Sequence, residues 1–417
     1  MEELNLAIGD IIVGIDIGTS KVSTVVGEVN NFNQIEVICS TKAKCEGVKK
    51  GKIVSEEEVA TAIAKTIQEA EEEANLKINS AYVTIPGKYT TIVQNSIVKE
   101  LKDKYSGISA KDVSSAIGQV RDIEIPDGQT LIDIVPDKFI LDDGKVVNDP
   151  VGSISSHFTL SAQIILAEKT YIRQLYTIFK KACIEIDGIV PSSLAERNLI
   201  LDANELTDNV MILNIGAGNT EIGVFEGSSF IYTDTIPLGG DSITRDISLV
   251  LEILEEEAER LKKQYGLALK SFIDNDNDII LNTNTGVSSE GKTRTIKSSY
   301  LIEIIEARIE EIFSLVNKNI TNEGIKSRIN NVVLTGQGIT SISKSDVAGK
   351  IALNIPVKMA TGRLISTIKP CYRTSYALLR YIASRPFAKT VSSSIDSKTE
   401  ESFLKKILSR IKEFFYS

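Results

Sequence analysis

Two short turns rich in small residues hold the residues best suited to phosphate chemistry. The segment Ile11–Val29 reads IIVGIDIGTSKVSTVVGEV, and Asn209–Gly227 reads NVMILNIGAGNTEIGVFEG. Each is an apolar strand, a tight polar turn and a second strand of Val, Ile and Thr, which predicts a β-hairpin. Backbone N–H groups in such turns can form an anion nest, and small side chains let a phosphate approach closely. The turn residues are Gly18, Thr19, Ser20 and Lys21 in the first copy and Gly216, Ala217, Gly218, Asn219 and Thr220 in the second.

The end of the first strand differs between the two copies. Asp16 ends this strand in the first copy, and Asn214 stands at the aligned position in the second. A carboxylate at such a place can hold Mg²⁺ through water, as phosphate-bound Mg²⁺ prefers, so Asp16 is the expected metal ligand. One hairpin of this kind is common in proteins, but two aligned copies predict two related domains that grip one phosphate chain from opposite sides.

A third glycine-containing turn lies in the apolar segment Asn331–Ile339, which reads NVVLTGQGI. A buried strand that ends in such a turn lets a nucleoside pack on bare backbone. We therefore expect Gly336, Gln337 and Gly338 to contact a nucleoside.

The segment Pro237–Gly266 is expected to form a glycine turn that leads into a pair of helices. Gly239 and Gly240 make up the turn. Glu259 and Lys262 are three positions apart and share one face of the second helix. They are candidates for contacts with the ribose and the edge of the base, and the alternative is a solvated ion pair.

The composition is that of a globular protein and argues against several classes of function. The chain has 417 residues, 42% hydrophobic and 25% charged, which is long enough for several domains. A net charge of −9 argues against a general nucleic-acid binder. His157 is the single histidine, and without a partner motif we expect it to be structural. The four cysteines lack CxxC spacing and no signal peptide is evident, so we expect a cytoplasmic protein with reduced thiols.

Helices and strands are expected to alternate around these motifs. Helical patterns cover Ser55–Ala74, Lys169–Cys183 and Ser299–Asn317, the last being a long amphipathic helix with exposed Glu side chains. Apolar strands alternate with such patterns around the two hairpins. This alternation predicts an α/β protein in which helices cover mixed sheets.

The C-terminal residues differ in composition from the rest. Residues 388–400 are rich in Ser and Thr and predict a flexible linker, and residues 401–417 have an amphipathic helical pattern. Such a helix suits an anionic membrane surface. The alternative is docking on its own domain, against which the linker argues, or in a partner's groove. The residues expected at the membrane are Phe403, Leu404, Lys405, Lys406, Ile407, Leu408, Arg410, Ile411, Lys412, Phe414 and Phe415.

The ordered set of motifs resembles a known superfamily. DIGTSK, the repeat NIGAGNTEIGV, AERLK and VVLTGQGI resemble the ATP-binding folds of the actin and sugar-kinase superfamily. Within it, nearly the whole chain resembles the FtsA family of bacterial cell-division proteins. AYVTIPGKYT, VPDKFILDD and NDPVGSISS resemble that family's insertion, called subdomain 1C. The resemblance implies an actin-like two-lobed fold with duplicated mixed-sheet domains, a 1C insertion, a C-terminal amphipathic helix, and ATP with Mg²⁺ as cofactors.

The resemblance also implies a division of the chain into subdomains. The expected boundaries are 10–80 and 164–205 for subdomain 1A, 81–163 for 1C, 206–245 and 326–387 for 2A, 246–325 for 2B, 388–400 for the linker and 401–417 for the membrane helix.

The function implied is structural. ATP-bound copies of the chain would polymerise on the inner face of the cytoplasmic membrane and tether filaments of the tubulin-like protein FtsZ to it at the division septum. In the family, an Arg of subdomain 2B that matches Arg308 receives the acidic C-terminal peptide of FtsZ, for which an Arg is a suitable anchor. The alternative for Arg308 is an ion pair with Glu303, Glu311 or another nearby acid.

The sequence departs from the family pattern at the phosphate site. Asn214 replaces a usual Asp, Ala217 replaces a usual Gly, and Gln337 interrupts the Gly run of the adenosine turn. No Glu or Gln stands beside Pro191, where related ATPases position the attacking water, and the sequence does not decide where Glu196 lies. We expect ATP binding with slow or absent turnover, and on this view Asn214→Asp raises phosphate release.

Three other functions share features of this fold. A kinase would need a carboxylate base and a substrate cleft, and neither motif is evident. A chaperone of the DnaK type would need a β-rich peptide-binding domain after the ATPase region. A PilM-type cytoplasmic adaptor of a membrane assembly machine is the closest alternative, although that family is not expected to carry a basic terminal helix.

Overall fold

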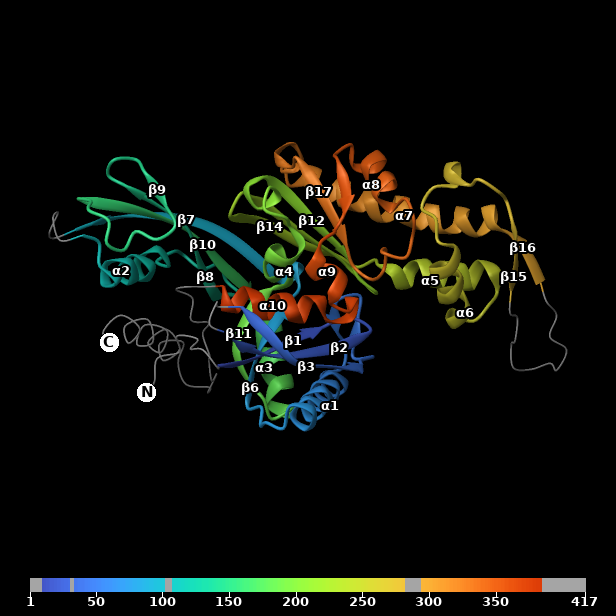
Figure 1. Ribbon diagram of the computed structural model, residues 1–417, viewed down its shortest axis with the longest axis horizontal. Helices are drawn as coiled ribbons and strands as arrows, with labels where there is room; N and C mark the ends of the chain where they lie inside the picture. The colour runs from blue at the N-terminus through green and yellow to red at the C-terminus, as the bar shows by residue number, and fades with distance from the viewer. Residues whose placement is uncertain (1–9, 31–33, 102–106, 282–293, 385–417) are drawn as a thin grey trace.

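The computed structural model describes residues 10–30, 34–101, 107–281 and 294–384. Two five-stranded sheets stand one above the other in the middle of Figure 1, with an elongated insertion at one end and a helical group at the other. The predicted linker at 388–400 and the predicted membrane helix at 401–417 lie outside the described residues.

The first sheet is mixed and carries the first glycine turn. Its strand β1 pairs antiparallel with β2 and parallel with β6. Helices α1 and α3 pack together, with α1 against β2 and β3, and α10 packs against β1 and β2 from the other face. We call this sheet with these helices the first lobe. In sheet order its strands are β11 (Glu185–Pro191), β6 (Ser80–Ile85), β1 (Ile11–Ile17), β2 (Lys21–Val29) and β3 (Ile35–Lys44), and its helices are α1 (Glu56–Ala74), α3 (Lys169–Lys181) and α10 (Arg373–Ala383).

The second sheet repeats this topology and carries the second glycine turn. Strand β12 pairs antiparallel with β13 and parallel with β17, as β1 does with β2 and β6. The predicted duplication of a mixed-sheet domain is therefore confirmed. In sheet order the strands are β14 (Ser229–Ile236), β13 (Thr220–Glu226), β12 (Asn209–Ile215), β17 (Asn331–Thr335) and β18 (Val357–Met359).

Helices surround the second sheet, and all of them except α4, which lies between the lobes, make up the second lobe with it. Helix α4 packs on β12 and β13 between the two lobes, and α5, α6, α7 and α8 lie on the far side. The predicted helix pair in Pro237–Gly266 is present as α5 and α6, and α7 is longer at both ends than the predicted Ser299–Asn317. The helices are α4 (Ser192–Ile200), α5 (Gly240–Leu251), α6 (Glu255–Tyr265), α7 (Ser298–Asn322), α8 (Ser345–Leu353) and α9 (Arg363–Thr367).

The insertion has its own sheet and a small core. Its long strands pair antiparallel in the order β7, β10, β8, β9, and α2 packs on β7 and β10. Phe139 and Phe158 are buried in its core. The elements are β7 (Thr90–Glu100), α2 (Ala110–Val120), β8 (Gln129–Leu141), β9 (Val146–Val147) and β10 (His157–Glu168); two small hairpins elsewhere are β4 (Val48–Lys49) with β5 (Lys52–Ile53), and β15 (Asp278–Leu281) with β16 (Arg294–Lys297).

Two elements lie in a different lobe from the one that the sequence predicted. The insertion was expected to begin at residue 81, but β6 pairs with β1 and β11 inside the first sheet. We therefore propose that the insertion begins after Ile85. Helix α10 was expected in the second lobe, within 326–387, yet it packs on β1 of the first. The reason is that the chain crosses back to the first lobe after β18, and strand pairing across such distances leaves no local signal.

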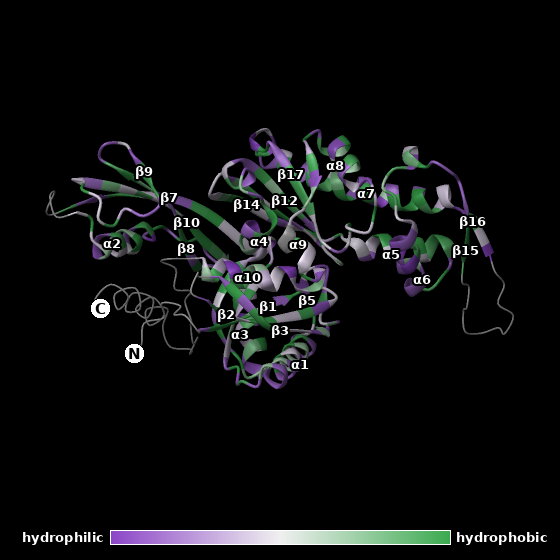
Figure 2. Cartoon of the chain, viewed as in Figure 1, coloured by the Kyte–Doolittle hydropathy of each residue, from purple (hydrophilic) through white to green (hydrophobic). Residues whose placement is uncertain are grey.

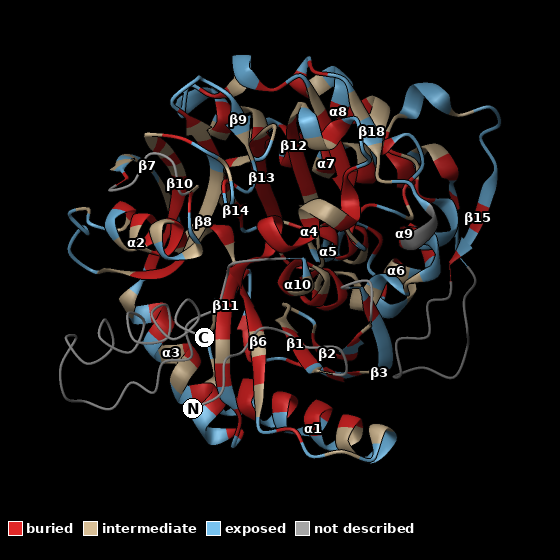
Figure 3. Ribbon diagram, turned by 60° about the vertical axis from the view of Figure 1, so that its left-hand side comes forward, coloured by how far each residue is buried: buried red, intermediate tan, exposed pale blue. Residues whose placement is uncertain are grey.

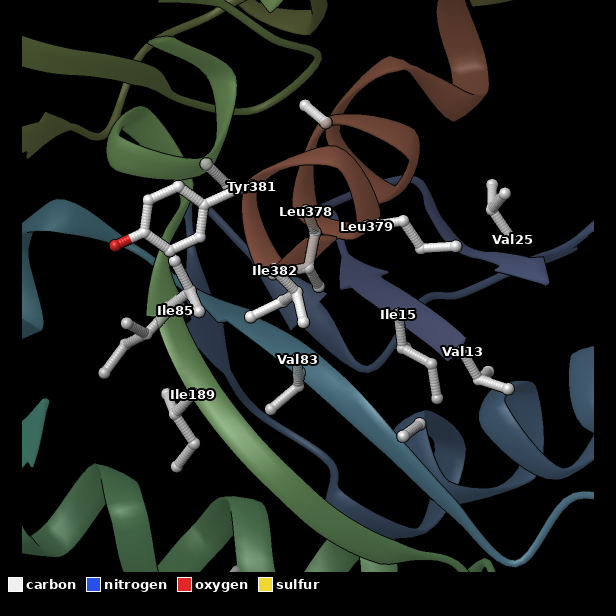
Figure 4. Packing of buried hydrophobic residues seen from close by; sticks show 14 of the residues in the cluster. Val13, Ile15, Val25, Val83, Ile85, Ile189, Leu378, Leu379, Tyr381 and Ile382 are labelled. Carbon is white, nitrogen blue, oxygen red and sulfur yellow. The ribbon is translucent and has the colours of Figure 1, made fainter. Parts of the chain in front are cut away.

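Helix α10 approaches the first sheet closely. In Figure 4 its side chains Leu378 and Leu379 reach toward the strands that carry Ile15 and Val83. A Cβ atom on Gly14 of β1 would lie 2.3 Å from Leu379 Cδ1 and 2.9 Å from the Ser375 carbonyl. Glycine at this position is thus what lets the helix backbone lie directly on the sheet.

The central strand of the second lobe is buried on both faces. Val210 and Ile212 of β12 join the core that faces α4, while Met211 and Leu213 join the core under α5 and α7. Figure 2 shows the apolar character of this strand, and Figure 3 shows that strands and α4 are buried while outer helix faces are exposed. Within the described ranges, no helix has both the length and the apolar character needed to cross a membrane.

Candidate functional site

The two predicted phosphate turns face each other across one cavity between the lobes. The cavity has a volume of about 130 Å³. Residues predicted from the motifs that line it are Asp16, Gly18, Thr19, Ser20, Lys21, Asn214, Gly216, Ala217, Asn219, Gly336 and Gln337. Residues that the motifs did not point to also line it, among them Thr84, Ser192, Glu196, Glu221, Arg373 and Thr374.

The two turns have the same backbone geometry and touch. In the first, Gly18 N–H donates to the Lys21 carbonyl at 2.9 Å; in the second, Gly216 N–H donates to the Asn219 carbonyl at 2.9 Å. A Cβ atom on Gly218 would lie only 2.4 Å from Thr19 Cγ2 of the opposite turn. Glycine at 218 therefore allows the lobes to close onto each other at this point.

Two hydroxyl groups at the cavity are left without a protein partner. Within the described residues, Thr19 Oγ1 and Ser192 Oγ are buried and make no hydrogen bond. Buried hydroxyls normally have hydrogen-bond partners. Two that have none at the same cavity are suited to a polar ligand such as a phosphate chain. The residues present thus suit the phosphates of a nucleotide.

Asp16 lies where a hydrated metal ion could be held. Thr84 Oγ1 donates to Asp16 Oδ1 at 2.7 Å, because parallel pairing of β1 and β6 brings the ends of these strands together. Burial raises the pKa of Asp16, and the Thr84 hydroxyl and the Lys21 ammonium oppose that rise. A single carboxylate beside phosphates suits Mg²⁺ that keeps most of its water. In the described part of the chain there is no group of three or more His, Cys, Asp or Glu that could hold a metal by itself.

Asn214 is paired with a buried acid. Its Nδ2 donates to Glu196 Oε1 at 2.8 Å and to Oε2 at 3.0 Å, and Thr374 Oγ1 donates to Oε1 at 2.6 Å. Glu196 is only 2% exposed, and burial raises its pKa to about 7 even though these bonds favour the carboxylate. The position of Glu196, which the sequence left undecided, is therefore at the cavity beside the second turn.

A second buried acid joins the cavity to the insertion. Glu221 of β13 accepts hydrogen bonds from Gly87 N–H, Thr235 Oγ1 and Asn219 Nδ2, each at 2.9 Å. Burial raises its pKa to about 7. Gly87 begins the short 3-10 turn Gly87–Tyr89 between β6 and β7. A Glu in the otherwise apolar and neutral strand TEIGVF is the one sequence signal that could have singled it out.

The third glycine turn packs on the second phosphate turn through backbone alone. Gly338 N–H donates to the Ile215 carbonyl, and Gly240 N–H donates to the Gly216 carbonyl, both at 2.9 Å. A Cβ atom on Gly338 would lie 2.2 Å from the Gly216 carbonyl oxygen. Gly338, Gly240 and the neighbouring Gly239 therefore lie behind the second turn, whereas Gly336, at a φ of 103°, lines the cavity. Thr220, next in β13, donates its hydroxyl to the Leu238 carbonyl at 2.8 Å.

Gln337 links the lobes. The Lys21 ammonium, at the start of β2 in the first lobe, donates to Gln337 Oε1 in the second. Burial lowers the pKa of Lys21. The residue that interrupts the glycine run thus contributes a hydrogen bond across the cavity.

Glu259 and Lys262 form a pair beside the helix start of α5, outside the cavity lining. Lys262 is 2% exposed, and its Nζ donates to the Gly240 carbonyl at 3.0 Å and to Thr244 Oγ1 at 2.7 Å as well as pairing with Glu259. A solvated ion pair, the alternative considered from the sequence, does not describe a lysine buried to this degree. Contact of this pair with a ribose stays a prediction.

Arg308 already has acidic partners within the chain. Its Nε lies 2.6 Å from Asp246 Oδ2 and its Nη2 lies 3.0 Å from Asp246 Oδ1, and it also pairs with Glu311 on its own helix. The alternative predicted for Arg308, an ion pair with a nearby acid, is present, with Asp246 of α5 as the bidentate partner. Anchoring of a peptide by Arg308 stays a prediction.

Comparison with known families gives matches over most of the chain. The family model described as "Cell division protein FtsA" matches residues 211–377, and the model "SHS2 domain inserted in FTSA" matches residues 87–166. The second match begins after β6, as the sheet pairing indicates. The chain is 30% identical over 372 residues to "Cell division protein FtsA" of Bacillus subtilis (strain 168), with 89% of this chain and 83% of that protein covered. It is 24% identical over 386 residues to the protein of the same name in Escherichia coli (strain K12), with 89% and 90% covered.

Solved structures of low sequence identity have the same fold. "PilM-PilN type IV pilus biogenesis complex" has a TM-score of 0.56 at 14% identity, covering 90% of this chain and 98% of that one. "Crystal structure of MreB5 of Spiroplasma citri bound to ADP" has a TM-score of 0.54 at 12% identity, with 97% and 99% covered. These matches concern the fold alone, which is actin-like, as the sequence predicted. Together with the family models and the relatives of matching length, they lead to one conclusion: the chain belongs to the FtsA family of actin-like cell-division proteins.

Proposed function

We propose that this chain binds ATP with Mg²⁺ between its lobes, polymerises on the inner face of the cytoplasmic membrane, and tethers FtsZ filaments to that membrane at the division septum. The observation that carries the proposal is the pair of glycine turns that face each other across one cavity. Its family and its actin-like fold support a role in cell division, nucleotide binding and self-assembly.

The turns and their neighbours have the chemistry for a nucleotide triphosphate. Backbone N–H groups of both turns and the unpaired hydroxyls of Thr19 and Ser192 suit the phosphates. Asp16 suits hydrated Mg²⁺, which neutralises phosphate charge. Gly336 and Gln337 suit the nucleoside. We propose at most slow hydrolysis, because an amide replaces the carboxylate of the first copy at position 214.

Membrane attachment rests on the amphipathic sequence of residues 401–417. Its basic residues favour an anionic surface, and its apolar face favours burial at the boundary of the acyl chains. A single helix of this kind binds reversibly. Stable attachment therefore needs many copies in a polymer, where the effective concentration of each further helix is high.

Recruitment of FtsZ is proposed at the helical end of the second lobe, through Arg308. An acidic C-terminal peptide has to compete with Asp246, which holds two of the guanidinium nitrogens. Asp246 holds the guanidinium in a fixed orientation, and Glu311 pairs with its third nitrogen. A peptide carboxylate can therefore bind Arg308 by displacing Glu311 or Asp246.

The test is co-sedimentation with vesicles of anionic phospholipid, with and without ATP and Mg²⁺. The full chain is compared with a truncation after Glu400, which keeps every described residue. We expect pelleting that needs both ATP and residues 401–417. If the full chain binds ATP and stays in the supernatant, the membrane tether is wrong and docking of the helix on a partner protein takes its place. The fold likeness to the PilM–PilN complex makes a cytoplasmic adaptor of a membrane machine the second candidate in that case.

A further inference from the structure

The internal repeat places different chemical groups at equivalent positions of the two hairpins. Asp16 precedes the first turn at the end of β1, and Asn214 precedes the second turn at the end of β12. Both residues line the same cavity. The second hairpin thus lacks a carboxylate of its own at this position, and the nearest acid comes from another element.

That acid is Glu196 on α4. Both of its carboxylate oxygens lie within hydrogen-bond distance of Asn214 Nδ2, at 2.8 and 3.0 Å. Its Oε1 is held in addition by the Thr374 hydroxyl from α10 at 2.6 Å. Helix α4 can lie this close because Gly223 of β13 has no side chain: a Cβ atom there would lie 2.4 Å from Ser193 Cβ. Glu196 is therefore fixed by two lobes before any ligand binds.

This contact decides which end of the Asn214 amide faces which way. A carboxylate only accepts hydrogen bonds, so the amide has to turn its NH₂ group toward Glu196. The Oδ1 atom then points away from Glu196, toward the Gly336 turn, where a Cβ atom on Gly336 would lie 2.5 Å from it. An amide without an acidic partner could present either end to the cavity.

We propose that Glu196 is a positioning residue for the second phosphate hairpin: it fixes Asn214 Oδ1 as an oxygen acceptor on the side of the Gly336 turn that lines the cavity, and in its ionised form it supplies the negative charge that Asp16 supplies beside nucleotide-bound Mg²⁺ in the first hairpin. The oxygen and the charge of one carboxylate are thus divided between two residues. This inference rests on the proposed binding of ATP with Mg²⁺. It concerns two residues of this chain and no step of hydrolysis.

The division changes the expectation for Asn214→Asp. From the sequence alone, this substitution restores a missing carboxylate. In the structure it places a second carboxylate within about 3 Å of Glu196, and two carboxylates at that distance cannot both ionise. The single substitution is therefore expected to weaken the site, and the added substitution Glu196→Gln to restore it, because the charge then lies on residue 214 and the amide on residue 196.

The experiment measures binding of a non-hydrolysable ATP analogue to the full chain by calorimetry, in excess Mg²⁺ and in EDTA. Mg²⁺ is expected to increase the affinity for the analogue, and in Glu196→Gln we expect this increase to be about tenfold smaller. An effect of this size is typical of a residue that orients the groups around a metal. Asn214→Asp is expected to lose at least as much, and Asn214→Asp with Glu196→Gln to regain most of the Mg²⁺-dependent affinity. Affinity in EDTA changes little in all three.

Glu205→Gln is the matched control. Glu205 is also buried, at 7% exposure, but it binds Lys358 and the Asp202 N–H and does not line the cavity. Its substitution should leave the Mg²⁺ dependence unchanged.

Two results overturn the inference while ATP binding stands. One is a Glu196→Gln variant that keeps the full gain from Mg²⁺. The other is a double variant that binds no better than Asn214→Asp alone, and this comparison carries the test by itself if Glu196→Gln does not fold. Absence of any ATP binding by the unmodified chain overturns the proposed function as well.

Discussion

The two phosphate hairpins have the same backbone but different surroundings. In the first, the Thr84 hydroxyl holds Asp16 at the end of β1. The second is enclosed: the Gly338 turn lies behind it, Glu196 holds Asn214, and Glu221 stands opposite Asn214 in the β12–β13 pair. Ser23 occupies the position opposite Asp16 in the first hairpin. The duplicated backbone is thus kept while the acids have moved to different elements.

This difference shows that two aligned positions of a repeat can be compared only together with the residues that surround each of them. Position 214, considered alone, has lost a carboxylate. The cavity around it has two buried acids, Glu196 and Glu221, each with a pKa raised to about 7 by burial. The second hairpin is therefore the more sensitive of the two to changes in packing and in protonation.

The largest expected effect comes from adding one methyl group behind each turn. In Gly338→Ala the new Cβ lies 2.2 Å from the Gly216 carbonyl oxygen, so backbone has to move, at a cost of about 3 kcal/mol. In Gly18→Ala the nearest atom, the Lys21 carbonyl oxygen, is 3.1 Å away, and the cost should stay below about 1 kcal/mol. Urea unfolding of both variants measures the difference. Equal losses would mean that the third turn does not enclose the second hairpin in solution.

The next effect concerns protonation of Glu221. Its pKa lies at about 7 in the folded protein, above the ordinary value of 4.5. Between these values the folded state holds a proton that the unfolded state has released, so this group's contribution to the free energy of unfolding falls as pH rises from 4.5 to about 7.

The variant Glu221→Gln removes this fall, on the order of 2 kcal/mol. The measurement is the free energy of unfolding against pH for both proteins, and only the slopes are compared, because Gln also changes the hydrogen bonds to Gly87 and Thr235. Parallel curves would show that Glu221 is not a titrating buried acid. Ser23→Ala, at the equivalent register position of the first hairpin, is the control and should leave the slope unchanged.

The smallest effect separates the two hydroxyl donors. Thr84→Val takes away a hydroxyl that donates to Asp16 and should cost about 1 kcal/mol of unfolding free energy. Thr374→Val should cost less, because Glu196 keeps both contacts with the Asn214 amide. Thermal unfolding of both variants at one fixed pH measures the two losses. A larger loss of stability in Thr374→Val than in Thr84→Val would mean that the second hairpin depends more on its hydroxyl donor than the first does.

Much of the site could be predicted because its signals are local. The repeat around Asp16 and Asn214 gave the two hairpins and their opposed placement. The helical pattern over Ser55–Ala74 gave helix α1 to within a residue, and in the structure Ser55 caps that helix, its Oγ accepting from Glu58 N–H. Each of these patterns depends on neighbours in sequence, which a single chain contains.

The rest depends on pairing across long distances. Thr84 reaches Asp16 because β6 pairs with β1, and Thr374 reaches Glu196 because α10 returns to the first lobe. Nothing in SSLAERNLI distinguishes Glu196 from a solvent-exposed helical acid. For the same reason, the boundaries expected from the sequence put β6 in the insertion and α10 in the second lobe. Residues that support a ligand-binding residue come from other elements, and only the fold brings them together.

The short turn at Gly87 gives the insertion a mechanical role. A Cβ atom on Gly87 would lie 2.3 Å from Thr233 Oγ1 and 2.8 Å from the Asp234 nitrogen, and its N–H is held by Glu221 at the cavity wall. The chain leaves the first lobe at Ile85 and is clamped to the second lobe two residues later, before it enters β7. A rotation of one lobe against the other would therefore strain this joint and change the angle at which the insertion leaves the two lobes.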